Sequence, residues 1–128
     1  MQSRASGAVA NQYGGRTARA LAKIIGATPT SSTSNEFQLG TDAVTVRCAR
    51  KKTTSVGVTY LMLDRVSKVL AAFENDDGSY SVWSMGPRTF RGHMRPTRSR
   101  GPAAGRVGIV SRATFEQLGS LVGTGIRP

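Results

Sequence analysis

The chain is poor in the residues from which many functional sites are built. It has one cysteine, Cys48, and one histidine, His93, among 128 residues. A single cysteine excludes a disulfide within the chain, and one cysteine with one histidine cannot supply the four ligands of a structural zinc site. The lack of a disulfide framework fits a reducing compartment, so we expect a cytoplasmic protein.

Long apolar runs are also missing. No run of consecutive apolar residues is long enough for a transmembrane helix, and we expect no secretory signal because the first residues contain no apolar core. No long basic amphipathic helix stands out either. The sequence therefore predicts no membrane partner.

Acidic residues are scarce. Seven Asp and Glu face 18 Lys and Arg, which gives a formal net charge of +11 at neutral pH. A positive excess of this size attracts polyanions at long range and gives affinity for phosphates whatever the base sequence. Nucleic acid is the expected partner, with DNA favoured over RNA, and binding requires no cofactor. The composition is also consistent with a nucleoid-associated protein or one encoded by a phage or mobile element.

The length and the hydrophobic content of 38% suit one domain with a modest core. Residues 1–14 are small and polar, and we interpret them as a flexible arm. Residues 15–122 form the expected nucleic-acid-binding domain. Residues 123–128 are read as a tail.

The apolar periods predict alternating helices and strands. Helices are expected over residues 15–25, 60–67 and 112–122, the last with Ser111 as its N-cap. Strands are expected over residues 36–39, 43–49, 56–58, 68–74, 80–85 and 106–110, the last at a sheet edge. The 68–74 strand is apolar at successive positions, which is typical of a strand covered on both faces. The order predicts an α/β or α+β fold with a small mixed sheet of four to six strands flanked by helices.

A polar face is predicted on the hairpin that the first two of these strands form. The turn at residues 40–42 contains Gly and Asp, and the second strand alternates so that Thr45 and Arg47 share one face. With close pairing, Glu36 approaches this face. A carboxylate, a hydroxyl and a guanidinium would then lie together.

Glu36, Thr45 and Arg47 in this order resemble the core of the PD-(D/E)XK, or restriction-endonuclease-like, superfamily. In that family an acid begins one strand, and the next strand carries a carboxylate, any residue and a lysine. The resemblance covers residues 15 to 85 and implies a Mg²⁺-dependent DNA endonuclease. On that interpretation Glu36 and Asp42 hold the metal and Arg47 stabilises the charge of the scissile phosphate.

The sequence departs from that family at the residues that matter for cleavage. Thr45 supplies no second anionic ligand, and Arg47 does not readily lose a proton as lysine can. The favoured hypothesis is thus a binding protein built on a degenerate nuclease core. The first alternative is the active endonuclease, acting as a homodimer to cut both strands. The second is an RNA-binding structural component.

Basic residues expected to contact phosphates fall into three groups. One is a stripe on the first helix, the second is a run after the 43–49 strand, and the third is an arginine-rich segment, residues 86–106, without acid and read as a long mobile loop. Phe90 within that loop either stacks on a base or pins the loop to the core. The expected contacts are Arg16, Arg19, Lys23, Arg50, Lys51, Lys52, Arg88, Arg91, Arg95, Arg98 and Arg100.

Overall fold

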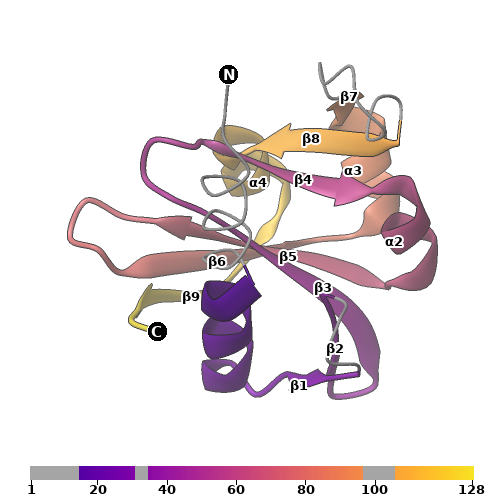
Figure 1. The fold of residues 1–128 in the computed structure, drawn as a ribbon. Helices are drawn as coiled ribbons and strands as arrows, with labels where there is room; N and C mark the ends of the chain where they lie inside the picture. The colour runs from indigo at the N-terminus through magenta and orange to yellow at the C-terminus, as the bar shows by residue number, and fades with distance from the viewer. Residues whose placement is uncertain (1–14, 31–34, 97–105) are drawn as a thin grey trace, which may run out of the picture.

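The computed structural model describes residues 15–30, 35–96 and 106–128, which form a mixed α/β fold (Figure 1). The strands are β1 (Thr28–Pro29), β2 (Glu36–Leu39), β3 (Asp42–Ala49), β4 (Ser55–Thr59), β5 (Lys68–Glu74), β6 (Tyr80–Met85), β7 (Arg95–Pro96), β8 (Val107–Ser111) and β9 (Ser120–Ile126). The helices are the N-terminal helix (residues 15–24), α2 (Tyr60–Arg65), α3 (Pro87–His93) and α4 (Arg112–Leu118).

The described strands form two sheets. A six-stranded mixed sheet has the order β1-β2-β3-β5-β6-β9, and a three-stranded antiparallel sheet has the order β4-β8-β7. The larger sheet confirms the predicted fold class, a small mixed sheet flanked by helices. The smaller sheet was not predicted, because nothing in the sequence shows that β4 leaves the main sheet.

The β2–β3 hairpin forms where the sequence predicts it. Leu39 pairs with Asp42, so Gly40 and Thr41 make a two-residue turn, and Gly40 has a φ of 62°. A positive φ at this position is what a tight hairpin turn requires and what glycine adopts without strain. The short turn fixes the register along the whole hairpin.

The two faces of the six-stranded sheet are covered differently. The N-terminal helix lies on one face, and the smaller sheet with α3 and α4 lies on the other (Figure 1). β5 runs parallel to β3 and is buried from Val69 to Phe73, as expected for a central strand with both faces covered. Residues along β5 alternate between the two cores.

One core lies under the N-terminal helix. Ala18, Leu21 and Ala22 pack there against Phe37 and other apolar residues of the large sheet. These helix positions recur every three or four residues, which is the spacing of one helix face. Cys48 packs partly buried against this core, and burial raises the pKa of its thiol. The thiol therefore has the environment of a structural residue.

The second core lies between the two sheets. It contains Val56 and Val58 of β4 and Val110 of β8, together with Phe73, Phe90 and Phe115, which the structure buries completely or nearly so. β8 lies in the middle of the smaller sheet, between β4 and β7. The prediction that residues 106–110 form an edge strand was therefore wrong, because β7 covers the side of β8 that was expected to be free.

The interpretation of residues 86–106 as one long loop was also wrong. Pro87 begins α3, and the fixed φ of proline suits the first position of a helix. β7 follows this helix. Phe90 is fully buried, and its ring meets that of Phe115 edge to face at 6.2 Å between centroids. It therefore pins this segment to the core. One of the seven residues of α3 is buried, so the sequence shows no helical apolar period there, and this helix was not predicted.

The last predicted helix is shorter than expected and the predicted tail is largely a strand. Ser111 is the N-cap, as predicted, and its Oγ accepts a hydrogen bond from the Thr114 N–H at 3.2 Å. The helix ends at Leu118, and β9 then pairs antiparallel with β6. Leu121 and Val122, expected to face inward from the helix, are 52% and 43% exposed on this edge strand.

Gly119 makes the abrupt change from α4 to β9 possible. A Cβ there would lie 2.6 Å from the Ser84 carbonyl oxygen and 2.7 Å from the Phe115 carbonyl oxygen, both backbone atoms. We expect Gly119→Ala to lower the free energy of unfolding by about 1–3 kcal/mol, measured by urea denaturation. The matched control is Gly92→Ala in α3, where no described atom outside this helix lies within 4 Å of the added Cβ. A Gly119→Ala variant as stable as this control would contradict the argument.

Candidate functional site

The hairpin brings three of the predicted site residues to one place. Glu36 pairs directly with Thr45 across β2 and β3, and Arg47 lies two residues further along the same face of β3. This face points toward the smaller sheet, opposite the face that Val44 and Val46 present to the N-terminal helix.

A pocket of about 210 Å³ opens on this face between β3 and β4. It is bounded by both polar and apolar side chains, and no carboxylate lines it. The lining residues are Asn35, Thr45, Arg47, Gly57, Val58, Thr59, Met62 and Val107.

Thr45 is the unusual member of this lining. Only 1% of its surface is exposed, and its hydroxyl has no hydrogen-bond partner among the residues that the structure describes. Leaving a buried hydroxyl unsatisfied costs about 1–3 kcal/mol. Arg47 beside it is exposed, and none of the described carboxylates forms an ion pair with it.

Glu36 is engaged by Arg65 of α2 and by Thr30. Its Oε1 lies 3.0 Å from Arg65 Nε, and its Oε2 accepts a hydrogen bond from the Thr30 hydroxyl at 3.3 Å. The ion pair offsets the negative charge of Glu36. Glu36 therefore forms an ion pair with Arg65 and does not itself line the pocket.

Asp42 does not join Glu36, although the sequence suggested that both hold a metal ion. Asp42 and Thr45 are three residues apart on one strand and so lie on opposite faces. Asp42 instead contacts Lys68 at 3.3 Å and accepts a hydrogen bond from the Ser67 hydroxyl at 3.1 Å. These two contacts, that of Lys68 first, hold the pKa of Asp42 below its ordinary value. The strand alternation thus separates the predicted pair.

Asp64 forms an ion pair with Arg91 of α3 and is likewise held away from Glu36. Within the described ranges, no three His, Cys, Asp or Glu side chains are grouped so that they could hold a metal ion.

The predicted phosphate contacts are distributed over both sides of the large sheet. Arg16, Arg19 and Lys23 are exposed on the N-terminal helix, while Arg88 and Arg95 are exposed on α3 and β7, on the opposite side. Two of the predicted cations are in ion pairs with carboxylates, Lys51 with Asp76 at 3.3 Å and Arg91 with Asp64. Arg50 and Lys52 are exposed in the β3–β4 connection, and Arg98 and Arg100 lie outside the described residues.

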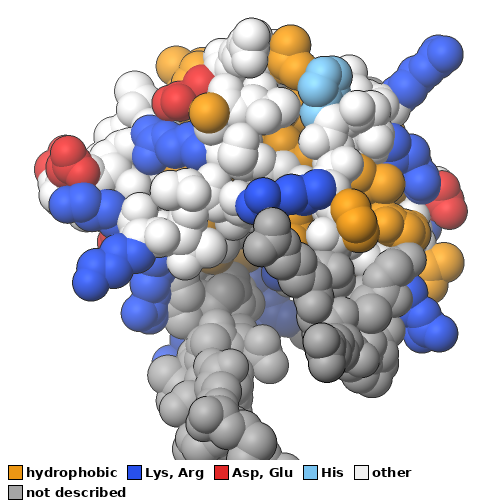
Figure 2. Space-filling view, turned by 90° about the horizontal axis from the view of Figure 1, so that it is seen from above, with side chains coloured by type: hydrophobic (Ala, Val, Ile, Leu, Met, Phe, Trp, Pro, Cys, Tyr) orange, Lys and Arg blue, Asp and Glu red, His pale blue; other side chains and the backbone are white. Residues whose placement is uncertain are grey.

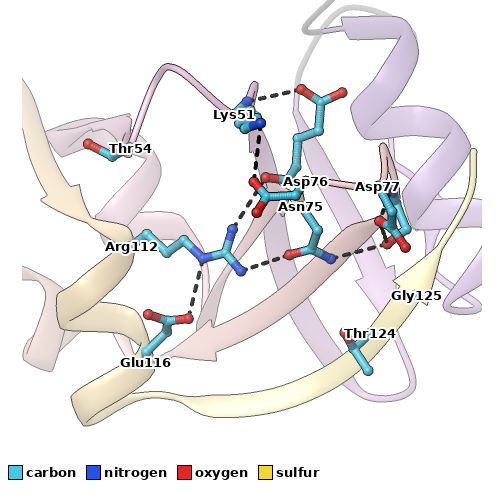
Figure 3. A pocket seen from close by; sticks show the side chains of 11 residues that line it. Lys51, Thr54, Asn75, Asp76, Asp77, Arg112, Glu116, Thr124 and Gly125 are labelled. Carbon is cyan, nitrogen blue, oxygen red and sulfur yellow. Dashed lines mark hydrogen bonds and ion pairs between the residues drawn. The ribbon is translucent and has the colours of Figure 1, made fainter.

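Sequence reasoning missed a second polar site, which surrounds Arg112 (Figure 3). Its guanidinium donates to the Asn75 Oδ1 at 2.8 Å and to the Glu74 carbonyl at 3.3 Å, and it pairs with Glu116 at 3.3 Å. The same guanidinium lies 5.7 Å from the centre of the Phe73 ring. The Arg112–Glu116 spacing is visible in the sequence, but the contacts to Glu74 and Asn75 cross more than thirty-five residues.

A pocket of about 720 Å³ adjoins Arg112, and four carboxylates line it. Each carboxylate already has a partner. Glu74 accepts the Lys51 N–H at 3.0 Å, and Asp76, Asp77 and Glu116 form ion pairs with Lys51, Arg127 and Arg112. The arrangement ties the β5–β6 turn to α4 and to the end of the chain, which is a structural role.

Asp77 in this turn makes the folded chain sensitive to acid. The Ser79 hydroxyl and N–H donate to its Oδ1 at 2.6 and 2.9 Å and hold the pKa of Asp77 below 3.8, its ordinary value. Because the folded pKa is the lower one, the stabilisation is complete above the ordinary value and is lost as pH falls through the folded pKa.

We expect Asp77→Asn to be less stable than the wild type at about pH 7, and we expect this difference in stability to shrink as the pH falls through the folded pKa of the aspartate. Urea denaturation at a series of pH values measures this difference. A stability gap that persists unchanged into acid would show that the carboxylate charge is not responsible.

Comparisons with known proteins give no relative. No family model, no curated protein and no solved structure matches the chain. In the described part of the chain, no helix is long and apolar enough to cross a membrane.

Proposed function

We propose that this protein binds nucleic acid, DNA in preference to RNA, by holding the phosphate backbone without reading base sequence. The observation that carries the proposal is how the charges are paired. All seven carboxylates lie in the described residues, and six of them form ion pairs with separate cations. The net charge of +11 is therefore carried by other Lys and Arg side chains.

The side of the large sheet that carries the smaller sheet is the favoured binding surface. It carries exposed cations that form no ion pair with any described carboxylate, namely Arg47, Arg88, Arg95 and Arg106. Figure 2 views this side from above and shows more Lys and Arg than Asp and Glu around its margin. Arginine suits such a surface because its planar fork can donate two hydrogen bonds to one phosphate.

The preference for DNA rests on the hairpin. The pairing of Glu36 with Thr45, beside Arg47, is the arrangement on which the resemblance to the PD-(D/E)XK superfamily depends. The same arrangement supports the alternative proposal of a Mg²⁺-dependent endonuclease, acting as a homodimer. That alternative needs a second carboxylate beside Glu36, and Asp42 and Asp64 are held elsewhere by Lys68 and Arg91.

The test compares two double variants of equal net charge. Arg88→Gln with Arg95→Gln removes cations without an acidic partner, whereas Lys68→Gln with Arg127→Gln removes cations that pair with Asp42 and Asp77. Fluorescence anisotropy with a DNA duplex across a salt series gives the affinity and its salt slope. We expect the first variant to weaken binding more and to reduce the slope by up to about 1.8, because each lost phosphate contact changes it by about 0.9.

Equal losses in both double variants would show that only total charge matters and would contradict the assigned surface. No binding by the wild-type chain at low salt would overturn the proposed function. The same complexes are then incubated with Mg²⁺. Cleavage that disappears in Glu36→Ala would replace the binding proposal with the endonuclease alternative.

A further inference from the structure

We propose that the pocket between β3 and β4 binds a single phosphate group through the Thr45 hydroxyl and the Arg47 guanidinium. This inference rests on the proposed function, since a backbone phosphate of the bound nucleic acid is the expected occupant. A free phosphate has the same chemistry, and the experiment below distinguishes the two sources.

The first observation is the state of the Thr45 side chain. It lines the pocket, is 1% exposed and has no hydrogen-bond partner among the described residues. Buried hydroxyl groups nearly always have partners, so one without a described partner that lines a cavity is available to donate to a group bound there. A phosphate oxygen accepts the hydrogen bond that this hydroxyl can donate.

The second observation is the charge around the pocket. Arg47 is the one charged residue in its lining, and no carboxylate belongs to that lining. The nearest acidic residue along the hairpin, Glu36, forms its ion pair with Arg65 at 3.0 Å. The pocket therefore presents a positive charge, and an anion that enters it finds a donor and a counter-ion together.

The third observation is the size and lining of the pocket. Its volume of about 210 Å³ is several times the roughly 30 Å³ that one water molecule occupies in the liquid. Val58, Met62 and Val107 form apolar walls beside the polar groups. Apolar walls reduce competition from water, which strengthens the attraction between Arg47 and an anion.

The proposal predicts an unusual effect of Thr45→Val on stability. Removing a buried hydroxyl that lacks a partner costs the folded chain nothing, so the Tm without ligand is expected to equal or exceed that of the wild type. The matched control is Thr59→Val in the same pocket. The Thr59 hydroxyl accepts a hydrogen bond from the Met62 N–H at 3.2 Å as the N-cap of α2, so this variant is expected to melt lower.

Binding is measured on the full chain with two probes, inorganic phosphate and a short DNA duplex. Amide chemical shifts of Thr45 and Gly57 report occupation of the pocket by phosphate, and anisotropy reports duplex affinity. We expect Thr45→Val and Arg47→Gln each to lower the affinity for inorganic phosphate and the affinity for the duplex by about tenfold or more. Arg127→Gln removes the same charge from a residue that pairs with Asp77 and does not line the pocket, and it is expected to leave phosphate binding unchanged.

Each outcome has one meaning. If both pocket variants bind inorganic phosphate and the duplex more weakly, the occupant is a backbone phosphate. If both variants bind only inorganic phosphate more weakly, the pocket is supported and its occupant is free phosphate. A lower Tm for Thr45→Val, or phosphate shifts that persist in both pocket variants, overturns the proposal even if duplex binding is normal. Absence of duplex binding by the wild type overturns the proposed function, and the phosphate titration still decides the pocket.

Discussion

The parallel pairing of β3 with β5 is the constraint on which the rest of this fold depends. Two parallel strands need a crossover connection, and here β4 and α2 provide it. The crossover carries β4 over the polar face of β3, where β4 pairs with β8 instead of joining the large sheet. The second core and the pocket beside Thr45 both follow from that one displacement.

The same displacement explains why a polar residue is buried in β3. If this face of the hairpin were open to water, Thr45 and Arg47 would both be solvated. Their positions two residues apart on one strand face predict this arrangement. In the folded chain Thr45 is almost completely buried, whereas Arg47 remains exposed. The fold thus places an unsatisfied hydroxyl beside an exposed cation, a local conflict of the kind that proteins tolerate where a site requires it.

Elements with strong local signals were predictable and those fixed by distant partners were not. The glycine-containing turn and the alternation of the second strand predict a polar hairpin from neighbouring residues. The register that pairs Glu36 with Thr45 depends on a two-residue turn, one residue shorter than the predicted turn at residues 40–42. In contrast, α3 buries only Phe90, and β9 follows α4 without an apolar period because its outer edge is exposed. The separation of Asp42 from Glu36 also follows from alternation, which applied to the hairpin would have excluded the pair beforehand.

The distribution of charge limits how a nucleic acid can be held. Cations without described acidic partners lie on both sides of the large sheet, with Arg16 and Lys23 on the helix side and Arg47 and Arg95 on the other. A straight duplex contacts one side of so small a domain at a time. Arg16 and Lys23 are exposed on the helix side, whereas on the other side Arg47 adjoins a pocket that contains a buried donor. Preformed donors lose less conformational entropy on binding, which favours the side of the smaller sheet.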